Sequence, residues 1–327
     1  MKRMVIIMMT LLLLTIAGHG SAETLVLKCG HSNPPSHPMH VQAEELAAYV
    51  KENTGGRIEI EIFPNEMLGS DKQMLEQVRM GALDIHIAPQ GVVSAYTPKM
   101  AAIGLPFLFQ NYEQVAAVCD GKIGEQIGTD LSKNGMVLLF FWDNGFRHIT
   151  NNVKPIRKPE DLKGLKIRTP EDEMTLAIFK TLGANPAPLP FSELYMALQQ
   201  KVFDGQENPS TNIFHSKFYE VQKFLSLTGH KYETSPFIVS AKTWKKLSEE
   251  EQKVLTEGAI KFGIKNRAVF KAQDEKYNKE LGNLGMTINQ ADIPAFQTAS
   301  QPVYVEYRQK CGVAFIEELT STIKSTK

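Results

Sequence analysis

The feature that most constrains the fold is an alternation of strand and helix patterns near the N-terminus. Residues 24–30 are typical of a strand, and a helix pattern follows Pro38. Residues 57–63 then alternate strictly between apolar and polar side chains, which predicts a strand with one buried face. A capping-box motif at Ser70 begins a second helix, and residues 84–88 are typical of a third strand. This order predicts an α/β sheet with ligand crevices at the carboxyl ends of its strands.

The middle of the chain repeats this alternation, and the C-terminal part is helical. The predicted middle elements are strands at 137–142, 147–151, 165–169 and 187–189, and helices at 171–182 and 192–200. Residues 248–284 are a mixed-charge helix pattern without proline, long enough to cross two lobes. A last helix is predicted over about residues 301–323. With 43% hydrophobic and 22% charged residues, the composition is that of a globular chain, and the predicted fold class is α/β.

The N-terminus has the features of an export signal. Lys2 and Arg3 precede an apolar run over residues 4–18, and small residues follow up to Ala22. The apolar run is shorter than the roughly 20 residues that a membrane-spanning helix needs. We therefore expect a signal peptide over residues 1–22 that is cleaved near Ala22, and a periplasmic mature protein that begins near Glu23. An uncleaved N-terminal anchor is the alternative.

The charge balance excludes two classes of partner. The chain has 36 basic and 36 acidic residues, so its formal net charge is zero. A general nucleic-acid-binding protein would show a basic excess, and so would a polybasic protein of the membrane surface. We expect neither nucleic acid nor a membrane surface as a partner.

The three cysteines are Cys29, Cys119 and Cys311. Export would place them in an oxidising compartment, where disulfides persist. Because their number is odd, at least one is free or pairs between chains. Buried free thiols and a single bridge both remain open from the sequence.

No motif for catalysis or metal binding stands out. The chain lacks the G-x-S-x-G elbow, the H-E-x-x-H zinc motif, a phosphate loop and the G-x-G-x-x-G fingerprint. His31, His37 and His40 form a cluster that could approach a zinc ion, but the spacing fixes no acidic partner. We therefore predict no catalytic residue, no cofactor and no metal ion.

Several short motifs, taken together, resemble one family. They are DLKGLKIR at 161–168, LGANP at 182–186, PFSELYMAL at 190–198, DGQENP at 204–209, FYEVQKF at 218–224, TGGRI at 54–58, FPN at 63–65 and LGSD at 68–71. The chain resembles the solute-binding proteins of TRAP (tripartite ATP-independent periplasmic) transporters, in the C4-dicarboxylate or DctP branch. The resemblance covers essentially the whole chain after residue 22.

The resemblance implies a fold and a set of partners. The fold is a two-lobed clam with a hinge, a ligand cleft and a long bridging helix, and without catalysis. Lobe I would comprise residues 23–145 with about 234–273, and lobe II about 146–233 with 274–327. The partners would be a small organic acid and the small and large membrane subunits of the permease, and the binding protein would be a monomer.

Three positions match the family's ligand site most closely. Arg168 matches the principal carboxylate clamp, and a guanidinium can bind a carboxylate through two parallel hydrogen bonds. Asn208 matches the amide that completes carboxylate recognition, and Phe191 matches the aromatic side chain beside the ligand. The alternatives are a surface ion pair for Arg168, a turn residue for Asn208 and core packing for Phe191.

Other positions are expected near the ligand. Arg147 matches a second arginine of the family site, with a structural ion pair as the alternative. Trp142 ends a predicted buried strand and could form a wall of the cleft or belong to the core. On the facing lobe, the expected contacts are His31, Ser32, Asp71 and Gln90.

The acidic residues after Arg168 bear on the ligand class. If Glu171 or Asp172 faces the cleft, its carboxylate would repel a second ligand carboxylate and accept hydrogen bonds from hydroxyl groups. That arrangement favours a sugar acid such as a uronate, about as strongly as the family name favours a C4-dicarboxylate. The alternative is that these residues are solvated at a helix N-terminus, which suits acidic side chains.

Two other functions share the same motifs. A sensor module would present the ligand to a membrane receptor, and only its partner would distinguish it. An exported enzyme on the same fold would turn over the bound acid.

Overall fold

The computed structural model describes residues 24–326, so the predicted signal peptide lies outside the described residues. Its strands are β1 (Leu25–Gly30), β2 (Ile58–Phe63), β3 (Ile85–Ile87), β4 (Met136–Asn151), β5 (Lys166–Thr169), β6 (Asn185–Pro188), β7 (Gly205–Pro209), β8 (Phe224–Ser240) and β9 (Thr287–Gln290). Its α-helices are α1 (Pro38–Asn53), α2 (Asp71–Met80), α3 (Gln90–Val93), α4 (Pro98–Ala102), α5 (Tyr112–Cys119), α6 (Lys122–Ser132), α7 (Glu173–Thr181), α8 (Phe191–Gln199), α9 (Ser210–His215), α10 (Ala241–Trp244), α11 (Glu249–Asn283), α12 (Ile293–Ala299), α13 (Gln301–Cys311) and α14 (Val313–Ser325). Two 3₁₀ helices, η1 (Pro159–Leu162) and η2 (Phe218–Glu220), complete the described elements.

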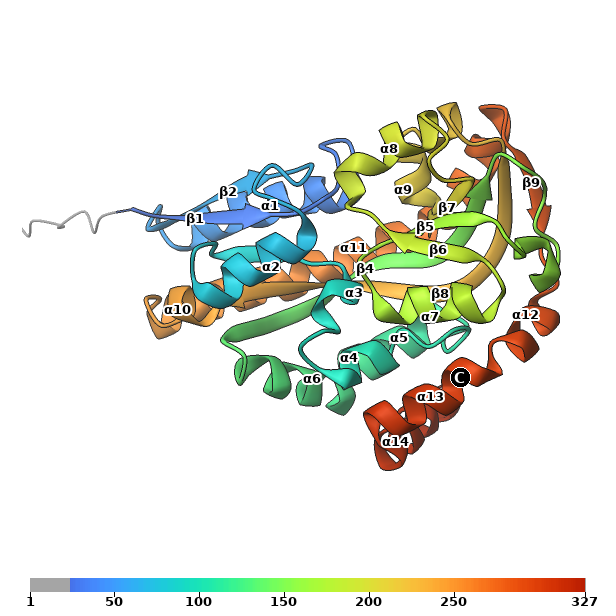
Figure 1. The fold of residues 1–327 in the computed structure, drawn as a ribbon. Coiled ribbons are helices and arrows are strands. Elements are labelled where there is room, and N and C mark those ends of the chain that lie inside the picture. The colour runs from blue at the N-terminus through green and yellow to red at the C-terminus, as the bar shows by residue number, and fades with distance from the viewer. Residues whose placement is uncertain (1–23, 327) are drawn as a thin grey trace, which may run out of the picture.

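One continuous sheet organises the molecule. Its strand order is β2-β1-β3-β8-β4-β7-β5-β6, with β9 also paired to β8. The β2-β1-β3 group at one end and the β7-β5-β6 group at the other are parallel. The long antiparallel strands β4 and β8 run from one group to the other, as Figure 1 shows. The predicted α/β class is therefore confirmed.

Local signals fix the elements that the sequence predicted best. The Ser70 and Ser248 hydroxyls cap α2 and α11, each within a capping box, and Gly81 ends α2 in the left-handed region at φ +77°. In β2 the side chains of Ile58 and Ile60 are buried, as the alternation required. Both helices consequently begin at the residues that their caps predict.

Two predictions about continuity were wrong. The strands predicted at 137–142 and 147–151 are one strand, β4, whose register against β8 shifts between Asp143 and Gly145. The predicted last helix is two helices, α13 and α14, because the chain turns at Gly312 with φ +86°. A residue with a Cβ is strained at that angle, which makes glycine the suitable residue for the break.

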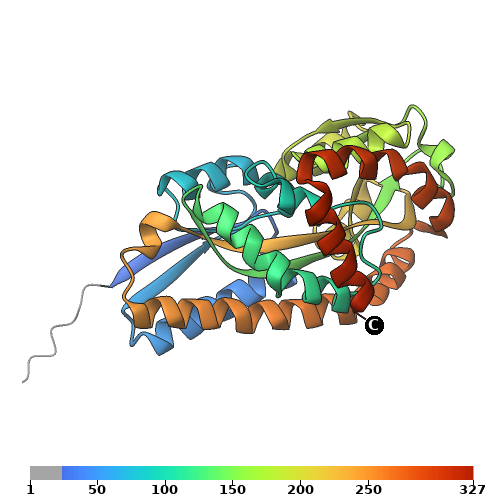
Figure 2. The ribbon, with the colours of Figure 1, turned by 90° about the horizontal axis from the view of Figure 1, so that it is seen from below.

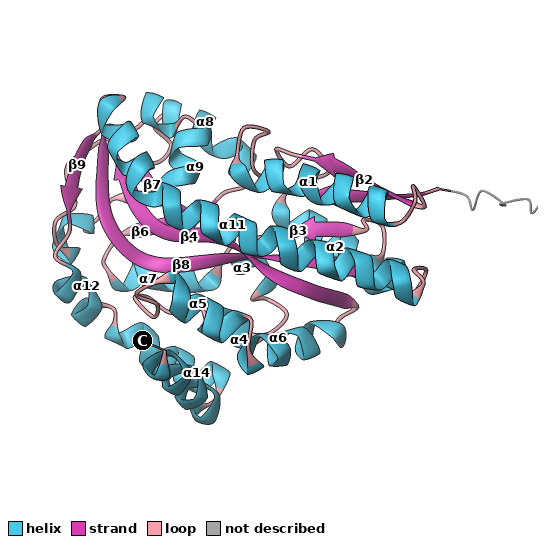
Figure 3. Ribbon diagram, turned by 180° about the vertical axis from the view of Figure 1, so that it is seen from behind, coloured by secondary structure: helices cyan, strands magenta, loops and turns pink. Residues whose placement is uncertain are grey.

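The longest helix ties the two ends of the sheet together. α11 packs against α1 and β4 in its first part and against α9 and β9 further along. Figures 2 and 3 show it running along one side of the molecule, across the long strands. The predicted bridging helix is thus present over the expected residues.

The C-terminal helices α13 and α14 pack mainly on other helices. α14 packs against α5, while α13 contacts both α4 and α7. The sequence-based division places α4 and α5 in lobe I and α7 in lobe II, so this terminal segment reaches both. Within residues 24–326, no helix combines the length and the apolar character that crossing a bilayer would require.

Candidate ligand-binding site

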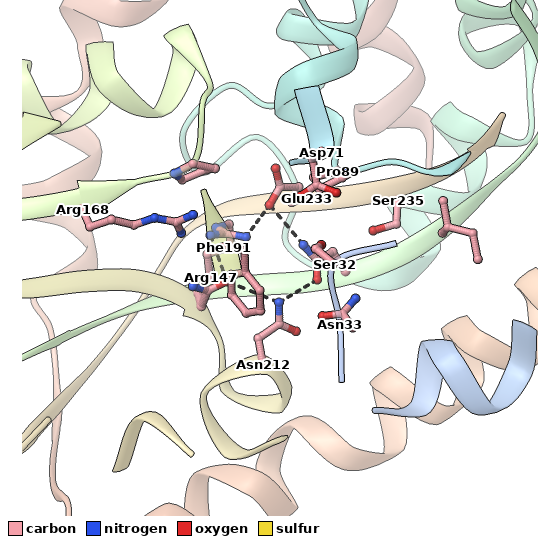
Figure 4. Close-up of a pocket in the computed structure, with 14 residues that line it drawn as sticks. Ser32, Asn33, Asp71, Pro89, Arg147, Arg168, Phe191, Asn212, Glu233 and Ser235 are labelled. Carbon is pink, nitrogen blue, oxygen red and sulfur yellow. Dashed lines mark hydrogen bonds and ion pairs between the residues drawn. The ribbon is translucent and has the colours of Figure 1, made fainter. Parts of the chain in front are cut away.

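A cavity lies where the two groups of strands meet, near the carboxyl ends of several strands. Its volume open to a water molecule is about 30 Å³, and it is lined by Ser32, Asn33, Asp71, Ile87, Pro89, Asn144, Arg147, Arg168, Pro170, Phe191, Asn208, Asn212, Glu233 and Ser235. They come from β3, β4, β5, β7 and β8, from the loops after β1, β3 and β5, and from α2, α8 and α9, and Figure 4 shows the labelled side chains lying around one space. The lining is therefore polar and drawn from both ends of the sheet.

Arg168 brings a buried positive charge to this cavity without an anionic partner. Only 2% of the residue is exposed. Its Nε and Nη2 both donate to the Leu189 carbonyl, at 2.9 and 2.5 Å, and it forms no ion pair within the described chain. Burial and the charge of Arg147, opposed by the charge of Glu207, lower the pKa of Arg168 to about 10, so the guanidinium is still charged at neutral pH. A buried charge of this kind is costly until an anion pairs with it.

Arg147 lines the same cavity but is neutralised by the protein. Its Nε and Nη2 donate to the Glu207 carboxylate at 2.5 and 2.7 Å, and its Nη1 donates to Glu233. Although burial opposes them, these two carboxylates raise the pKa of Arg147 above its usual value. The structural ion pair weighed for Arg147 is therefore present, and the residue faces the cavity as part of a charged cluster.

Asn208 and Phe191 lie in the cavity beside the two arginines. The Asn208 Oδ1 accepts hydrogen bonds from Arg147 Nη2 at 3.2 Å and from Asn212 Nδ2 at 3.3 Å. The Phe191 ring centroid lies 5.8 Å from the Arg168 guanidinium carbon, and the ring also packs edge-on against Phe218. Phe191 thus supports the guanidinium at the first position of α8.

On the β1 side, Ser32 and Asp71 line the cavity as predicted, but His31 and Gln90 do not. The His31 ring is fully buried, and its Nε2 lies 3.0 Å from His40 Nδ1. Burial, and secondarily His40, lowers the pKa of His31 to about 3. The Gln90 side chain instead joins Met100 to Thr234, donating to the Met100 carbonyl and accepting from the Thr234 amide.

Trp142 belongs to the core rather than to the cavity wall. Its side chain is fully buried, its Nε1 donates to the Ala259 carbonyl at 2.9 Å, and its ring lies against Phe237. Of the two alternatives weighed for this residue, the structure places it in the core.

The acidic residues after Arg168 do not line the cavity. Asp172 is the N-cap of α7, accepting from the Met174 and Thr175 amides, and its Oδ2 lies 2.5 Å from Lys231 Nζ. Although burial opposes it, Lys231 lowers the pKa of Asp172. Glu171 is half-buried and lines a separate surface depression beside Lys72 and Glu193. The expectation that these two carboxylates bind ligand hydroxyls is not supported by their positions.

Sequence reasoning missed several residues of the cavity. They are Asn33, Asn144, Asn212, Glu233 and Ser235. Asn212 also forms a hydrogen bond with His37, whose Nε2 lies 3.1 Å from the Asn212 Oδ1. No local motif marks Glu233, since its position depends on the pairing of β8 with β4, but Asn33 directly follows the predicted contact Ser32.

Glu233 is the missed residue with the clearest chemistry. Its Oε2 accepts from Arg147 and Asn144. Its Oε1 is buried without a hydrogen-bond partner and forms an ion pair with Lys231 Nζ at 3.7 Å. This oxygen is an unused acceptor in the cavity lining.

The histidine cluster and the cysteines carry no metal site in the part of the chain that the structure describes. No group of three or more His, Cys, Asp or Glu residues there could hold a metal ion. His37 instead caps α1, so it does not converge with His31 and His40 on one point. Cys29, Cys119 and Cys311 are all free thiols, which leaves out the single bridge.

Comparison with known proteins gives one family. Residues 29–310 match the family model of bacterial extracellular solute-binding protein, family 7 (DctP). The 2,3-diketo-L-gulonate-binding periplasmic protein YiaO of Escherichia coli is 34% identical over 84% of each chain. An uncharacterized protein, y4mM, of Sinorhizobium fredii is 48% identical over 65% of this chain. That match covers 40% of y4mM, so this chain spans less than half of that relative's length.

Solved structures agree with the family. A TRAP periplasmic solute-binding protein of Polaromonas bound to D-erythronate has a TM-score of 0.88 and 35% identity, covering 91% of this chain and 98% of that one. A TRAP periplasmic solute-binding protein of Sulfurospirillum deleyianum with bound succinate has a TM-score of 0.86 and 32% identity, over 92% and 99% of the two chains.

Proposed function

Because the chain belongs to the bacterial extracellular solute-binding protein family 7, we propose that it captures an organic acid anion in the periplasm for a TRAP transporter. Relatives with solved structures carry the two-lobed α/β fold that the motifs implied, and organic acids are bound in them. The captured acid would then pass to the small and large membrane subunits of the permease. Residues 1–22 would serve as the cleaved export signal.

The single observation that carries this proposal is the unpaired charge of Arg168. The guanidinium is buried in the cavity wall and donates only to the Leu189 carbonyl, and opening of the proposed lobes would give an anion access to it. A ligand carboxylate would supply the missing charge and accept the charge-assisted hydrogen bonds that an arginine forms best. Arg147 is already bound to two carboxylates, so it would affect the ligand indirectly, through its hydrogen bonds to Asn208 and Glu233.

Within the class of organic acids, the cavity favours a hydroxylated monocarboxylate such as a sugar acid. The free Oε1 of Glu233 would accept a hydrogen bond from a ligand hydroxyl, which is worth about 1.5–3 kcal/mol when one partner is charged. A second ligand carboxylate at that place would face a like charge in a partly dry site, which costs binding free energy. Glu233, rather than Glu171 or Asp172, is therefore the residue that we expect to distinguish sugar acids from dicarboxylates.

Capture would involve closure of the two lobes around a hinge. The register shift between Asp143 and Gly145 lies opposite Thr234 and Glu233, which is where the proposed lobe boundaries cross β4 and β8. Several hydrogen bonds join the proposed lobes beside the cavity, and two of them involve no residue of the long strands β4 and β8. His37 meets Asn212 at 3.1 Å, and the Ser192 amide donates to Glu66 Oε2 at 2.9 Å. Contacts made only in the closed form supply the differential affinity that closure needs.

A ligand panel tests the proposal. Thermal shift and calorimetry with D-erythronate, D-galacturonate and succinate should show binding by at least one acid, with sugar acids ahead of succinate. Saturating ligand at a thousand-fold excess over Kd should stabilise the protein by about 4 kcal/mol. Arg168→Ala should then weaken binding by about 2–5 kcal/mol, roughly 30- to several-thousand-fold.

Arg168→Lys is the matched control for charge. It keeps the positive charge but loses the planar fork, so we expect it to bind nearly as poorly as Arg168→Ala. Unchanged affinity in a folded Arg168→Ala protein would remove Arg168 from the site and defeat the proposal.

A further inference from the structure

Asp71 lines the cavity, and His86 lies directly behind it on β3. His86 Nδ1 is 2.9 Å from the Gly30 carbonyl oxygen. Because a carbonyl only accepts, this nitrogen must carry a hydrogen and donate it. The other ring nitrogen, Nε2, lies 3.5 Å from Asp71 Oδ1. Both of these atoms are buried, and neither has a hydrogen-bond partner among the described residues.

If Asp71 were ionised and His86 neutral, neither Asp71 Oδ1 nor His86 Nε2 would carry a hydrogen to donate to the other. With its hydrogen on Nδ1, a neutral imidazole presents a lone pair at Nε2, and a carboxylate oxygen presents another. Two buried acceptors that face each other without a donor are costly. One additional proton removes the conflict, whether it is bonded to the oxygen or to the nitrogen, and in either case the pair has no net charge.

We propose that Asp71 and His86 share one proton at neutral pH, so that the pair presents no net charge to an anionic ligand. His86 is then a positioning residue that sets the charge of a ligand-facing carboxyl group, and the pair makes the cavity tolerant of an anion. The inference rests on the proposed function for its effect on ligand affinity, but the shared proton is a property of the ligand-free protein.

The surroundings of the pair support this assignment. Burial, and then the charge of Glu66, raises the pKa of Asp71 well above its usual range. Burial lowers the pKa of His86 to about 4. The charged and titratable groups that face the pair from other elements are Glu66, His31, Arg168 and Glu233.

The shared proton predicts a pH dependence with a definite sign. When pH rises through the pKa of the pair, the pair loses its proton and gains one negative charge beside the ligand. Anion affinity should therefore fall on the alkaline side, by at most about tenfold per pH unit, because one proton is linked to binding. Asp71→Asn cannot gain that charge, so its affinity should stay level over the same range.

The test is a double-mutant cycle with D-erythronate as the probe, measured by calorimetry at pH 7.5. Asp71→Asn sets the reference Kd of the cycle, because its amide cannot ionise, and adding His86→Gln to it should change that Kd by no more than about threefold. In His86→Gln the amide N–H can donate to Asp71 Oδ1, which favours the ionised carboxylate, and affinity should fall about tenfold or more. Adding Asp71→Asn to His86→Gln should return the affinity to that of Asp71→Asn alone.

Two outcomes of the cycle would overturn the proposal. If Asp71→Asn binds about tenfold or more tightly than wild type, Asp71 is ionised beside the ligand. If the double variant binds about tenfold more weakly than Asp71→Asn alone, His86 only supports the structure.

A measurement without ligand separates this proposal from the proposed function. In nitrogen-15 spectra of the imidazole groups, the signals of His86 are those that disappear in His86→Gln. We expect its signals to show a hydrogen on Nδ1 and to stay constant between pH 5 and 7.5. A titration near the ordinary histidine value of about 6.5 would overturn the shared proton. A constant signal together with no binding of any acid would overturn only the proposed function.

Discussion

Arg147 and Arg168 line the same cavity and are equally buried, with 2% of each residue exposed, but only Arg147 has anionic partners in the protein. Glu207 and Glu233 hold Arg147 through several hydrogen bonds. Arg168 reaches only the carbonyl of Leu189. The sequence context of the two arginines gives no hint of this difference.

The difference separates a charge that belongs to the fold from a charge reserved for a ligand. Breaking a buried ion pair leaves an uncompensated charge and is strongly destabilising. Removing a buried charge that has no partner takes away an unfavourable term instead. Arg147 should therefore matter most for stability, and Arg168 should matter most for binding.

The largest effect expected on stability comes from Arg147→Met. This variant leaves Glu207 and Glu233 buried without their shared cation, and we expect a loss of about 3–5 kcal/mol in the free energy of unfolding. Urea denaturation measures it. Arg308→Met is the matched control, because Arg308 pairs with Glu317 at 3.2 Å on the exposed surface. That control should cost about 1 kcal/mol or less, and equal losses for the two variants would contradict the comparison.

Acid should weaken the Arg147 site and spare the Arg168 site. Although burial opposes it, Arg147 lowers the pKa of Glu207 from 4.5 to about 2. A depressed carboxylate pKa contributes stability above the unfolded value, and this stability is lost as pH falls from about 4.5 towards 2. The contribution is about 3 kcal/mol by this linkage.

Urea midpoints between pH 6 and pH 2.5 measure this dependence. The slope should be smaller in Glu207→Gln, and Arg168→Met should keep nearly the wild-type slope because the hydrogen bonds of Arg168 among the described residues go to the Leu189 carbonyl and not to a carboxylate. A wild-type slope in Glu207→Gln would show that other carboxylates control the acid transition.

A smaller effect should distinguish Asp172 from Glu171. Asp172→Asn weakens the buried pair with Lys231 but keeps part of the helix cap, and Lys231 retains Glu233 at 3.7 Å. We expect a stability loss of about 2 kcal/mol. Glu171→Gln should change stability by about 0.5 kcal/mol or less, as is usual for surface substitutions. Calorimetry with D-erythronate should show unchanged affinity in both variants, and a weakened affinity in Glu171→Gln would return that residue to the site.

Local chemistry explains which parts of the fold the sequence predicts. The Ser248 capping box fixed the start of α11, and the alternation in β2 fixed its buried face. The break at Gly312 was missed, because a glycine inside a helical pattern can be tolerated or can end the helix. β8 was missed because its buried residues include His230, Lys231 and Glu233, which a hydrophobic pattern does not recognise.

The site residues divide in the same way, into those that local sequence motifs predict and those that depend on contacts between distant parts of the chain. Arg168, Asn208 and Phe191 were predicted because family motifs surround them. Trp142 and Asp172 needed the tertiary structure, since core packing and an N-cap look the same in sequence as a cleft contact. The partners of Arg147 come from β7 and β8, so only strand pairing reveals that its charge is already neutralised.

The most direct test of the difference between the two arginines is the stability of Arg168→Met without ligand. Urea denaturation of the ligand-free protein should give a free energy of unfolding within about 1 kcal/mol of wild type or above it, because the variant loses an unpaired charge and one hydrogen-bonding group. The same protein should no longer bind D-erythronate. A loss of about 3 kcal/mol or more without ligand, comparable to Arg147→Met, would show that Arg168 is a structural charge and contradict the account.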